Sequence, residues 1–283
     1  MSIRIVTDSG ADLESHEYQE LQVELIPIPM TMDGTTYLAD ASFDKSDFFR
    51  MLKEAEAFPS TSQPSPAQFQ AIFEDARQKG DELIYITLSS GLSGTYQSAC
   101  MIRDLDEYDN VYVVDSLTAT LGQKLLVMEA VRLREQGKAA REIAATLESI
   151  RDRVRIYAGI DTLEYLYKGG RLSRASASIG TLARIKPVIS VNVEGKIQLI
   201  GKGLGIGKAI SIVNSFVEKM PPDPNYPVLC VYSGSPANLT ELREKAKKAI
   251  DLDVPEEQCF SLGPVIGAHI GEGAFGFIYI SKD

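Results

Sequence analysis

The chain has 283 residues, 44% of them hydrophobic and 24% charged, and its formal net charge is −10. These values are ordinary for a globular protein, and the negative charge disfavours general nucleic-acid binding, which requires a broad basic face. No apolar run approaches the ~20 residues of a membrane helix, and the first residues lack the apolar core of a signal peptide. Cys100, Cys230 and Cys259 are widely spaced in apolar contexts, which predicts reduced core thiols in a cytoplasmic protein without a metal site.

In the first half, short apolar runs alternate with helical patterns. The expected strands and one hairpin turn lie at 2–8, 23–30, 32–38, 83–88 and 111–115. The expected helices lie at 11–21, 44–58, 67–76 and 95–105, with two more across 117–152. This alternation predicts βαβ units and a mostly parallel, Rossmann-like sheet.

The pattern restarts near residue 155. The expected elements are a strand at 155–160, a helix at 161–170, a β-hairpin about Glu194 and Gly195, a helix at 206–219, a strand at 228–235, a helix at 238–250 and a strand at 276–282. Asp161 and Glu164 match a capping box at the start of the first of these helices. We therefore predict two α/β domains, residues 1–154 and residues 155–283.

The loop TSQPSP, residues 61–66, contains more polar groups than a turn requires. Ser65 fits a helix N-cap, Pro66 the first helical position, and Gln68 the other half of a capping box. Thr61 and Ser62 have no such local role. They lie on a stretch stiffened by proline, so we expect them to present hydroxyl groups to a ligand.

The loop SSGLSGTYQS, residues 89–98, follows an expected strand and opens a helix, where unpaired N–H groups and the helix dipole favour an anion. Ser93 could simply cap the helix, but the loop holds four small hydroxyl residues, Ser89, Ser90, Ser93 and Thr95. The loop also nearly matches the G-x-S-x-G elbow of serine hydrolases, with Thr95 in place of the last glycine. A hydrolase therefore remains an alternative.

Two further sets of polar residues are candidates for a site. His269 lies in the glycine-rich stretch 263–276, which favours a ligand role on a flexible backbone segment, whereas His16 is expected at the surface of a polar helix. The basic residues Lys168, Arg171, Arg174, Arg184 and Lys186 are expected to form mostly a solvated face, with Arg171 as a candidate to bind an anion or an acidic partner. Asp8 and Asp115 follow strands and could bind Mg²⁺, but each precedes a serine, which favours a cap or turn.

The segments VTDSGADL, TSQPSP, LSSGLSGTYQSA, VVDS, DTLEYLYKGGRLS and GAHIGEGAFG resemble the DegV family in order and spacing, over nearly the whole chain. The resemblance implies a two-domain α/β protein, with the ligand between and within the domains, that binds one long-chain fatty acid. It implies a carrier without a cofactor and without enzymatic activity of its own. In bacteria such a carrier acts as the FakB subunit of fatty acid kinase, presenting the acyl carboxylate to an ATP-dependent partner that makes acyl-phosphate for phospholipid metabolism.

The resemblance also assigns residues. It implies that Thr61, Ser93 and His269 hold the carboxylate, to which we add Ser62 and the amide of Gly94. It implies that Arg171 contacts the kinase or the phosphate. The Arg-rich run of the family is replaced here by GKGLGIGK, which leaves Lys202 as the nearest candidate for a second contact. Glu272 replaces a proline of the family and is expected to face solvent.

The apolar tail needs a long dry slot, and the candidates for its lining are Ile160, Leu163, Leu166, Ile179, Leu182, Ile266 and Ile270. Two other functions stay open: a serine hydrolase that uses Ser93 and His269 with Asp115 or Asp161 as the acid, and an interaction module that binds no lipid. We expect a monomer that makes at most transient, peripheral contact with a membrane.

Overall fold

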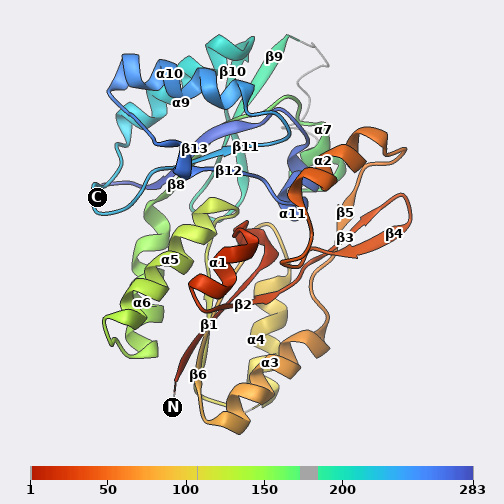
Figure 1. Cartoon of the computed structure of the whole chain (residues 1–283), viewed down its shortest axis with the longest axis vertical. Helices are drawn as coiled ribbons and strands as arrows, with labels where there is room; N and C mark the ends of the chain where they lie inside the picture. The colour runs from red at the N-terminus through yellow and green to blue at the C-terminus, as the bar shows by residue number, and fades with distance from the viewer. Residues whose placement is uncertain (1, 107, 173–183, 283) are drawn as a thin grey trace.

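The computed structural model describes residues 2–106, 108–172 and 184–282. A four-stranded sheet of order β2-β1-β6-β7, in which every neighbouring pair is parallel, forms the lower part of the molecule (Figure 1). Its strands are β1 (Ile3–Asp8), β2 (Val23–Ile26), β6 (Glu82–Thr87) and β7 (Val111–Asp115). The prediction of a mostly parallel sheet in the first half is confirmed.

Helices cover both faces of this sheet. Two of them, α3 (Pro66–Lys79) and α4 (Thr95–Asp106), pack on one face through a cluster that includes Phe69 and Phe73. The other face is covered by α5 (Leu121–Glu135) and α6 (Ala140–Ile150), and a short helix α1 (Ser15–Glu20) follows β1. The capping box of Ser65 and Gln68 at the start of α3 is confirmed.

The single strand expected at 23–30 is two strands in different sheets. After β2, the chain leaves the parallel sheet and forms β3 (Pro29–Met32), which pairs with β4 (Thr35–Leu38) and β5 (Ser60–Thr61). Pro27 and Pro29 have no N–H group to continue the ladder, which explains the break. The expected hairpin turn is confirmed at Asp33 and Gly34, which both have positive φ. The short strand β5, which carries Thr61, was not predicted from the sequence.

A six-stranded mixed sheet of order β10-β9-β8-β13-β11-β12 forms the upper part of the molecule (Figure 1). Its strands are β8 (Val154–Gly159), β9 (Ile185–Val191), β10 (Ile197–Leu204), β11 (Leu229–Tyr232), β12 (Cys259–Ser261) and β13 (Phe275–Ile280). The expected hairpin about Glu194 and Gly195 is confirmed as β9–β10. On one face lie α9 (Ile206–Lys219) and α10 (Ala237–Ile250).

The other face of the upper sheet packs on α5, so that one hydrophobic cluster extends from the lower sheet to the upper one. Ile5 and Ile84 of the lower sheet belong to it together with Ile156 and Ile278 of the upper sheet. The upper sheet begins at Val154, next to the predicted boundary. The division into two domains stays a prediction.

Three short helices lie beside the region between the two sheets, and Figure 1 shows all of them on the side of β3, β4 and β5. They are α2 (Lys45–Glu54), α7 (Glu164–Lys168) and α11 (Pro264–Ile270). The capping box expected at Asp161 is wrong, because Asp161 pairs with Lys186 while the Thr162 hydroxyl accepts the Glu164 N–H at 3.2 Å.

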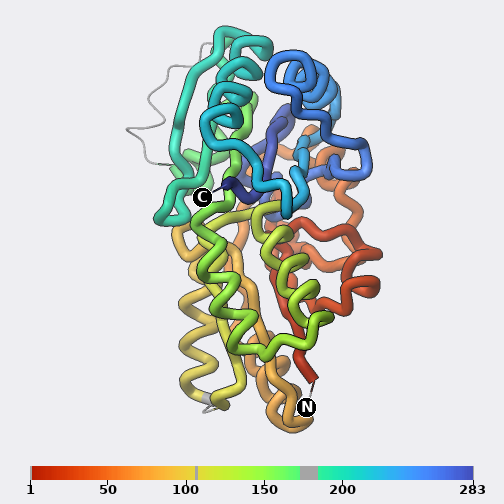
Figure 2. Tube along the Cα trace, turned by 90° about the vertical axis from the view of Figure 1, so that its left-hand side faces the viewer, coloured from red at the N-terminus to blue at the C-terminus, as the bar shows by residue number. Residues whose placement is uncertain are grey.

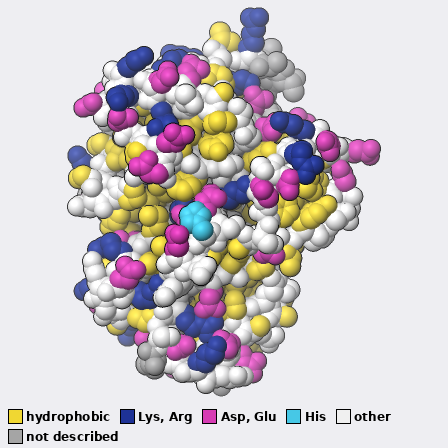
Figure 3. Space-filling model, viewed as in Figure 1, with side chains coloured by type: hydrophobic (Ala, Val, Ile, Leu, Met, Phe, Trp, Pro, Cys, Tyr) yellow, Lys and Arg dark blue, Asp and Glu magenta, His cyan; other side chains and the backbone are white. Residues whose placement is uncertain are grey.

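Figure 2 shows the molecule as an elongated body with the N-terminus at its lower end. Figure 3 shows acidic and basic side chains mixed over the viewed face rather than separated into two regions. Among the helices that the structure describes, none combines the length and the apolar character needed to cross a bilayer.

Candidate functional site

A pocket between the two sheets brings together side chains from distant parts of the chain. Thr61 comes from β5, Ser93 from the loop before α4, Arg171 from the turn after α7, and His269 from α11. The complete lining consists of Ile28, Thr61, Ser62, Leu88, Leu92, Ser93, Ala119, Leu166, Arg171, Ile197, Val265, Ile266, His269 and Ile270. The polar side chains are a minority, so the pocket has a small polar region and a mainly apolar wall.

His269 is bonded to Thr61, with 2.8 Å between Nε2 and the Thr61 hydroxyl oxygen. The expectation that His269 lies on a flexible segment is wrong, because it lies within α11. The neighbouring glycines allow close packing: a Cβ on Gly267 would lie 2.5 Å from the Phe48 ring, and one on Gly271 would lie 2.6 Å from the Tyr165 ring. The glycine-rich sequence therefore produces a tightly packed short helix.

The environment of His269 favours the neutral imidazole. Burial, and secondarily the positive charge of Arg171, lower the pKa of His269 to about 4. Nδ1 is buried and has no hydrogen-bond partner among the described residues. Gly169 closes this side of the ring, since a Cβ there would lie only 2.2 Å from Nδ1.

Ser93 lies at the same pocket but has other partners. Its hydroxyl oxygen is 2.8 Å from that of Thr95 and accepts the Thr95 N–H at 3.3 Å. It therefore supports the first turn of α4, as in the helix-cap alternative, while it lines the pocket. Ser62 also lines the pocket, next to Thr61.

Gly94 lies outside the pocket lining. Its carbonyl accepts the Ser98 N–H at 3.0 Å, at the start of α4. A Cβ on Gly94 would lie 2.3 Å from Oε1 of Gln63. Gly94 thus permits the close approach of the two loops that carry Ser93 and Thr61, and binding by its amide stays a prediction.

The contacts do not assemble the triad of the hydrolase alternative. In the described parts of the chain, no hydrogen bond joins Ser93 to His269. Asp115 accepts the N–H groups of Ser90 and Leu117, which confirms its expected turn role, and Asp161 pairs with Lys186. Asp8 likewise accepts the N–H groups of Gly10 and Leu88 as a cap.

Arg171 and Lys202, the two expected partner contacts, lie in different surroundings. The guanidinium of Arg171 lines the pocket and donates to the carbonyls of Leu92 at 3.0 Å and Gly169 at 2.5 Å. Burial lowers the pKa of Arg171. Lys202 is exposed on β10 and lies outside the pocket lining.

The tip of the β9–β10 hairpin holds the loop that carries Ser93. The Ser89 hydroxyl donates to the Gly195 carbonyl at 2.7 Å, and a Cβ on Gly91 would lie 2.6 Å from the Glu194 carbonyl oxygen. The first residue of β10, Ile197, forms part of the pocket wall. The upper half of the molecule thus fixes a loop of the lower half at the site.

Three of the residues expected around an apolar tail, Leu166, Ile266 and Ile270, line this pocket. Ile160 and Leu163 lie in the hydrophobic core instead, and Ile179 and Leu182 lie outside the described residues. Six lining residues were not predicted from the sequence: Ile28, Leu88, Leu92, Ala119, Ile197 and Val265. Leu88 precedes the hydroxyl-rich loop 89–98 and Leu92 lies within it, so their positions beside candidate ligand-binding residues could have predicted them.

The remaining candidates lie away from the pocket lining. Glu272, expected to face solvent, is partly buried, and its carboxylate lies 3.2 Å from the Lys53 ammonium. His16 is exposed, as expected. The ammonium of Lys168 lies 5.6 Å from the centre of the Phe58 ring. Within the described residues, no group of three or more His, Cys, Asp or Glu is arranged to hold a metal ion.

Fold and site together define an α/β protein with a narrow, mostly apolar pocket between its two larger sheets and a hydroxyl–imidazole pair in the pocket wall. Residues 2–282 match the family model described as "Uncharacterised protein, DegV family". The chain belongs to the DegV family. It is 36% identical over 293 residues to the DegV domain-containing protein YteA of Lactococcus lactis, covering 100% of this chain and 99% of the relative.

Solved structures show the same fold. A fatty-acid-binding DegV family protein from Thermus thermophilus is 32% identical with a TM-score of 0.85, and each chain is covered completely. A fatty-acid-binding DegV family protein from Streptococcus agalactiae is 28% identical with a TM-score of 0.87, covering 100% of this chain and 99% of that one. A stearic-acid-binding protein from Eubacterium ventriosum is 26% identical with a TM-score of 0.86, with the same coverage.

Proposed function

We propose that this protein binds a long-chain fatty acid, with the carboxylate at Thr61, Ser62, Ser93 and His269 and the hydrocarbon along the apolar wall. The observation that carries the proposal is the bond between Thr61 and His269 in the wall of an otherwise apolar pocket. The fatty-acid ligands of similar DegV structures support the same ligand class.

The tautomer of His269 determines what the Thr61 hydroxyl can do. An unpartnered N–H donor in a buried position costs more than an unpartnered ring nitrogen acceptor, because the donor loses its hydrogen bond to water. Since Nδ1 is buried without a partner, we infer that the proton is on Nε2 and is donated to Thr61. The Thr61 hydroxyl proton is then available for a carboxylate oxygen.

Charge at the pocket also favours an acid. Arg171 lines the pocket and contacts two backbone carbonyls rather than a carboxylate. A bound carboxylate would therefore meet a cation that lacks an acidic partner among the described contacts, together with hydroxyl donors. Hydrogen bonds to a charged group contribute about 1.5–3 kcal/mol each.

The hydrocarbon would supply most of the affinity. Each buried methylene contributes about 0.8 kcal/mol, so a chain of about fifteen carbons offers roughly 10 kcal/mol before the costs of ordering. The pocket volume is about 60 Å³, well below the roughly 300–1,000 Å³ of ordinary ligand pockets. Ligand binding must therefore separate the lining side chains, and the polar groups set the orientation of the acid.

We further propose that the protein presents the bound carboxylate to an ATP-dependent fatty acid kinase, which forms acyl-phosphate. Arg171 supports this role, because a guanidinium beside the carboxylate can also contact a phosphoryl group. Lys202 is the second proposed contact with the partner or the phosphate. The protein itself acts as a carrier and catalyses no hydrolysis.

The experiment separates the two parts of this proposal. Purified protein is denatured and extracted with solvent, and the extract is analysed by mass spectrometry; delipidated protein is then titrated with oleic and stearic acids. Absence of fatty acid from repeated extracts, together with no binding in the titration, would refute the ligand class. Addition of a purified kinase subunit and ATP, with hydroxylamine trapping of acyl-phosphate, tests the carrier role, for which the protein with ATP alone must give no product.

A further inference from the structure

Two of the three cysteines face each other across neighbouring strands. Cys230 of β11 and Cys259 of β12 are register partners in a parallel pair, so their side chains point to the same face of the sheet. Both are free thiols. Neighbouring strands lie about 4.7–4.9 Å apart, and disulfides span Cα separations of roughly 4.4–6.8 Å. A bond between the two sulfurs therefore requires no separation or sliding of the strands.

The two thiols differ in access and acidity. Cys230 is completely buried, whereas Cys259 is partly exposed on the edge strand β12. The neighbouring thiol lowers the pKa of Cys259 and raises that of Cys230, and the charge of Arg243 also favours the Cys259 thiolate. In the structure the Cys259 thiol donates to the Pro255 carbonyl at 3.5 Å. Cys259 is therefore the thiol that an oxidant reaches and that reacts first, and Cys230 is the thiol held next to it.

We propose that Cys230 and Cys259 form a reversible intramolecular disulfide when the protein meets a hydroperoxide. The Cys259 thiolate attacks one oxygen of hydrogen peroxide and the O–O bond breaks. The departing hydroxide takes up the proton that Cys259 released on ionising, which leaves a sulfenic acid on Cys259 and one molecule of water. The Cys230 sulfur then displaces hydroxide from the Cys259 sulfur, and the Cys230 proton converts the hydroxide to a second water. Two thiols are oxidised by two electrons and one peroxide is reduced.

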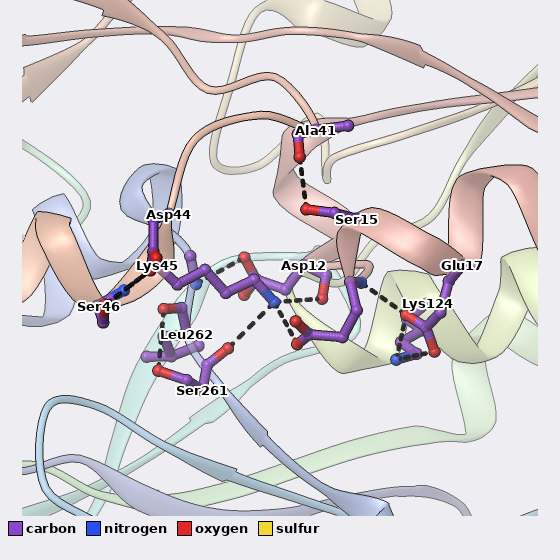
Figure 4. A network of polar contacts seen from close by, with 12 residues as sticks. Asp12, Ser15, Glu17, Ala41, Asp44, Lys45, Ser46, Lys124, Ser261 and Leu262 are labelled. Atoms are coloured by element: carbon purple, nitrogen blue, oxygen red, sulfur yellow. Dashed lines mark hydrogen bonds and ion pairs between the residues drawn. The ribbon is translucent and has the colours of Figure 1, made fainter.

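The position of β12 gives this bond a consequence for the pocket. Ser261, two residues after Cys259, accepts a hydrogen bond from the Lys45 ammonium at 3.4 Å, and Lys45 also donates to the carbonyl of Asp12 at 3.0 Å (Figure 4). The chain then enters α11, which carries His269. The disulfide would tie β12, the edge strand before α11, covalently to its neighbour β11 and restrict the segment that positions His269.

The test uses the full-length, reduced protein and hydrogen peroxide. After treatment, the exposed thiols of the folded protein are alkylated first, and the buried thiols are alkylated after denaturation. Tryptic peptides are then examined by mass spectrometry. We expect two of the three thiols to disappear, a disulfide-linked peptide pair containing Cys230 and Cys259, and recovery of all thiols with dithiothreitol. The disulfide would close a loop over residues 230–259, so the unfolding midpoint of the oxidised protein should be about 5 °C above that of the reduced protein.

Cys100 supplies an internal control, because burial raises the pKa of its thiol. The Cys100→Ser variant should form the disulfide as the wild type does, and Cys230→Ala should accumulate a Cys259 sulfenic acid that dimedone traps. Alanine is chosen at position 230 because serine would place an unsatisfied hydroxyl in the core. The unfolding midpoint of Cys230→Ala shows whether the variant is folded. Three free thiols after peroxide treatment, a disulfide only between two molecules, or equal dimedone labelling of Cys259 in the wild type and Cys230→Ala would each overturn the proposal.

Discussion

Thr61 and His269 are 208 residues apart in the chain, and a 2.8 Å hydrogen bond joins their side chains. The strand β5 has two residues and the helix α11 has seven. Elements this short are not stable by themselves, so they cannot fix the positions of Thr61 and His269 alone. Both elements contact each other and β3, so the bond depends on tertiary packing.

Replacement of Thr61 by Val should weaken fatty-acid binding and also lower stability by about 1–3 kcal/mol, because it leaves the buried Nε2–H of His269 without its acceptor. The substitution keeps the shape but removes the hydroxyl that we place on the carboxylate, so the loss of one charged hydrogen bond, about 1.5–3 kcal/mol, predicts a roughly tenfold to 150-fold higher Kd. Ser65→Ala, in the same loop, is the matched control: it removes the α3 cap and should lower stability by about 1 kcal/mol without changing affinity. Titration calorimetry and urea unfolding distinguish the two effects. Equal Kd values for Thr61→Val and the wild type would contradict the assignment.

Replacement of Gly169 by Ala should displace the imidazole of His269. Gly169 has a helical φ of −75°, so alanine is acceptable to the backbone, but its Cβ would lie 2.2 Å from Nδ1. We expect weaker fatty-acid binding and a loss of stability of about 1–3 kcal/mol from overpacking. Gly207→Ala, where the nearest atom is the end of the Lys245 side chain at 3.1 Å, should leave binding unchanged. Wild-type affinity in Gly169→Ala would show that the ring position is not important.

The pH dependence of stability should reveal the buried imidazole. The unfolded chain binds a proton at His269 below its ordinary pKa of about 6.5, whereas the folded protein does so only below about 4. The His269 contribution to stability is therefore complete above pH 6.5 and is lost as the pH falls to 4, by up to about 3 kcal/mol. Asp8 and Asp12, whose pKa values burial raises to about 6, act in the opposite direction because the folded protein retains their protons.

Comparison with His269→Gln isolates this contribution. Urea unfolding of both proteins from pH 7 to pH 4 should show the variant gaining up to about 3 kcal/mol relative to the wild type. Parallel stability curves would mean that His269 titrates normally. A bound carboxylate would stabilise the protonated ring, so saturating fatty acid should reduce the difference between the two proteins.

Replacement of Ala119 by Leu should narrow the apolar pocket. Ala119 is 5% exposed and is the small aliphatic residue of the wall. The larger side chain should raise the Kd of long acyl chains more than that of short ones, because only the long chains need the full pocket. Titration with a series from octanoic to stearic acid measures this difference. The same change in Kd for every acid of the series would place Ala119 near the carboxylate, at the polar end of the pocket. Ala209 lies on α9 in a separate hydrophobic cluster, so Ala209→Leu should change stability alone.

The sequence was most informative where short motifs carry their own chemistry. Thr61, Ser62, Ser93, Arg171 and His269 were all singled out by type and local context, and all five line one pocket. The parallel sheet was also predictable, because strand and helix patterns alternate clearly in the first half.

The rest depends on packing that no local pattern contains. The glycines around His269 suggested flexibility, although Gly267 and Gly271 accommodate the rings of Phe48 and Tyr165. The apolar wall was sought only in the second half, yet Ile28 and Ala119 come from the first. A buried aliphatic side chain has the same sequence signature whether it lines a pocket or fills a core.

The shared cluster around α5 and the bond from Ser89 to Gly195 also bear on how the molecule comes apart. Separation of the halves would expose Ile156 and Ile278 to water on one side and Leu121 and Leu125 on the other. Neither fragment produced alone would retain its native surface, and heat or urea should melt both sheets in a single cooperative transition. A ligand that occupies the junction would then protect the entire chain from proteolysis, even at peptide bonds remote from the acyl group.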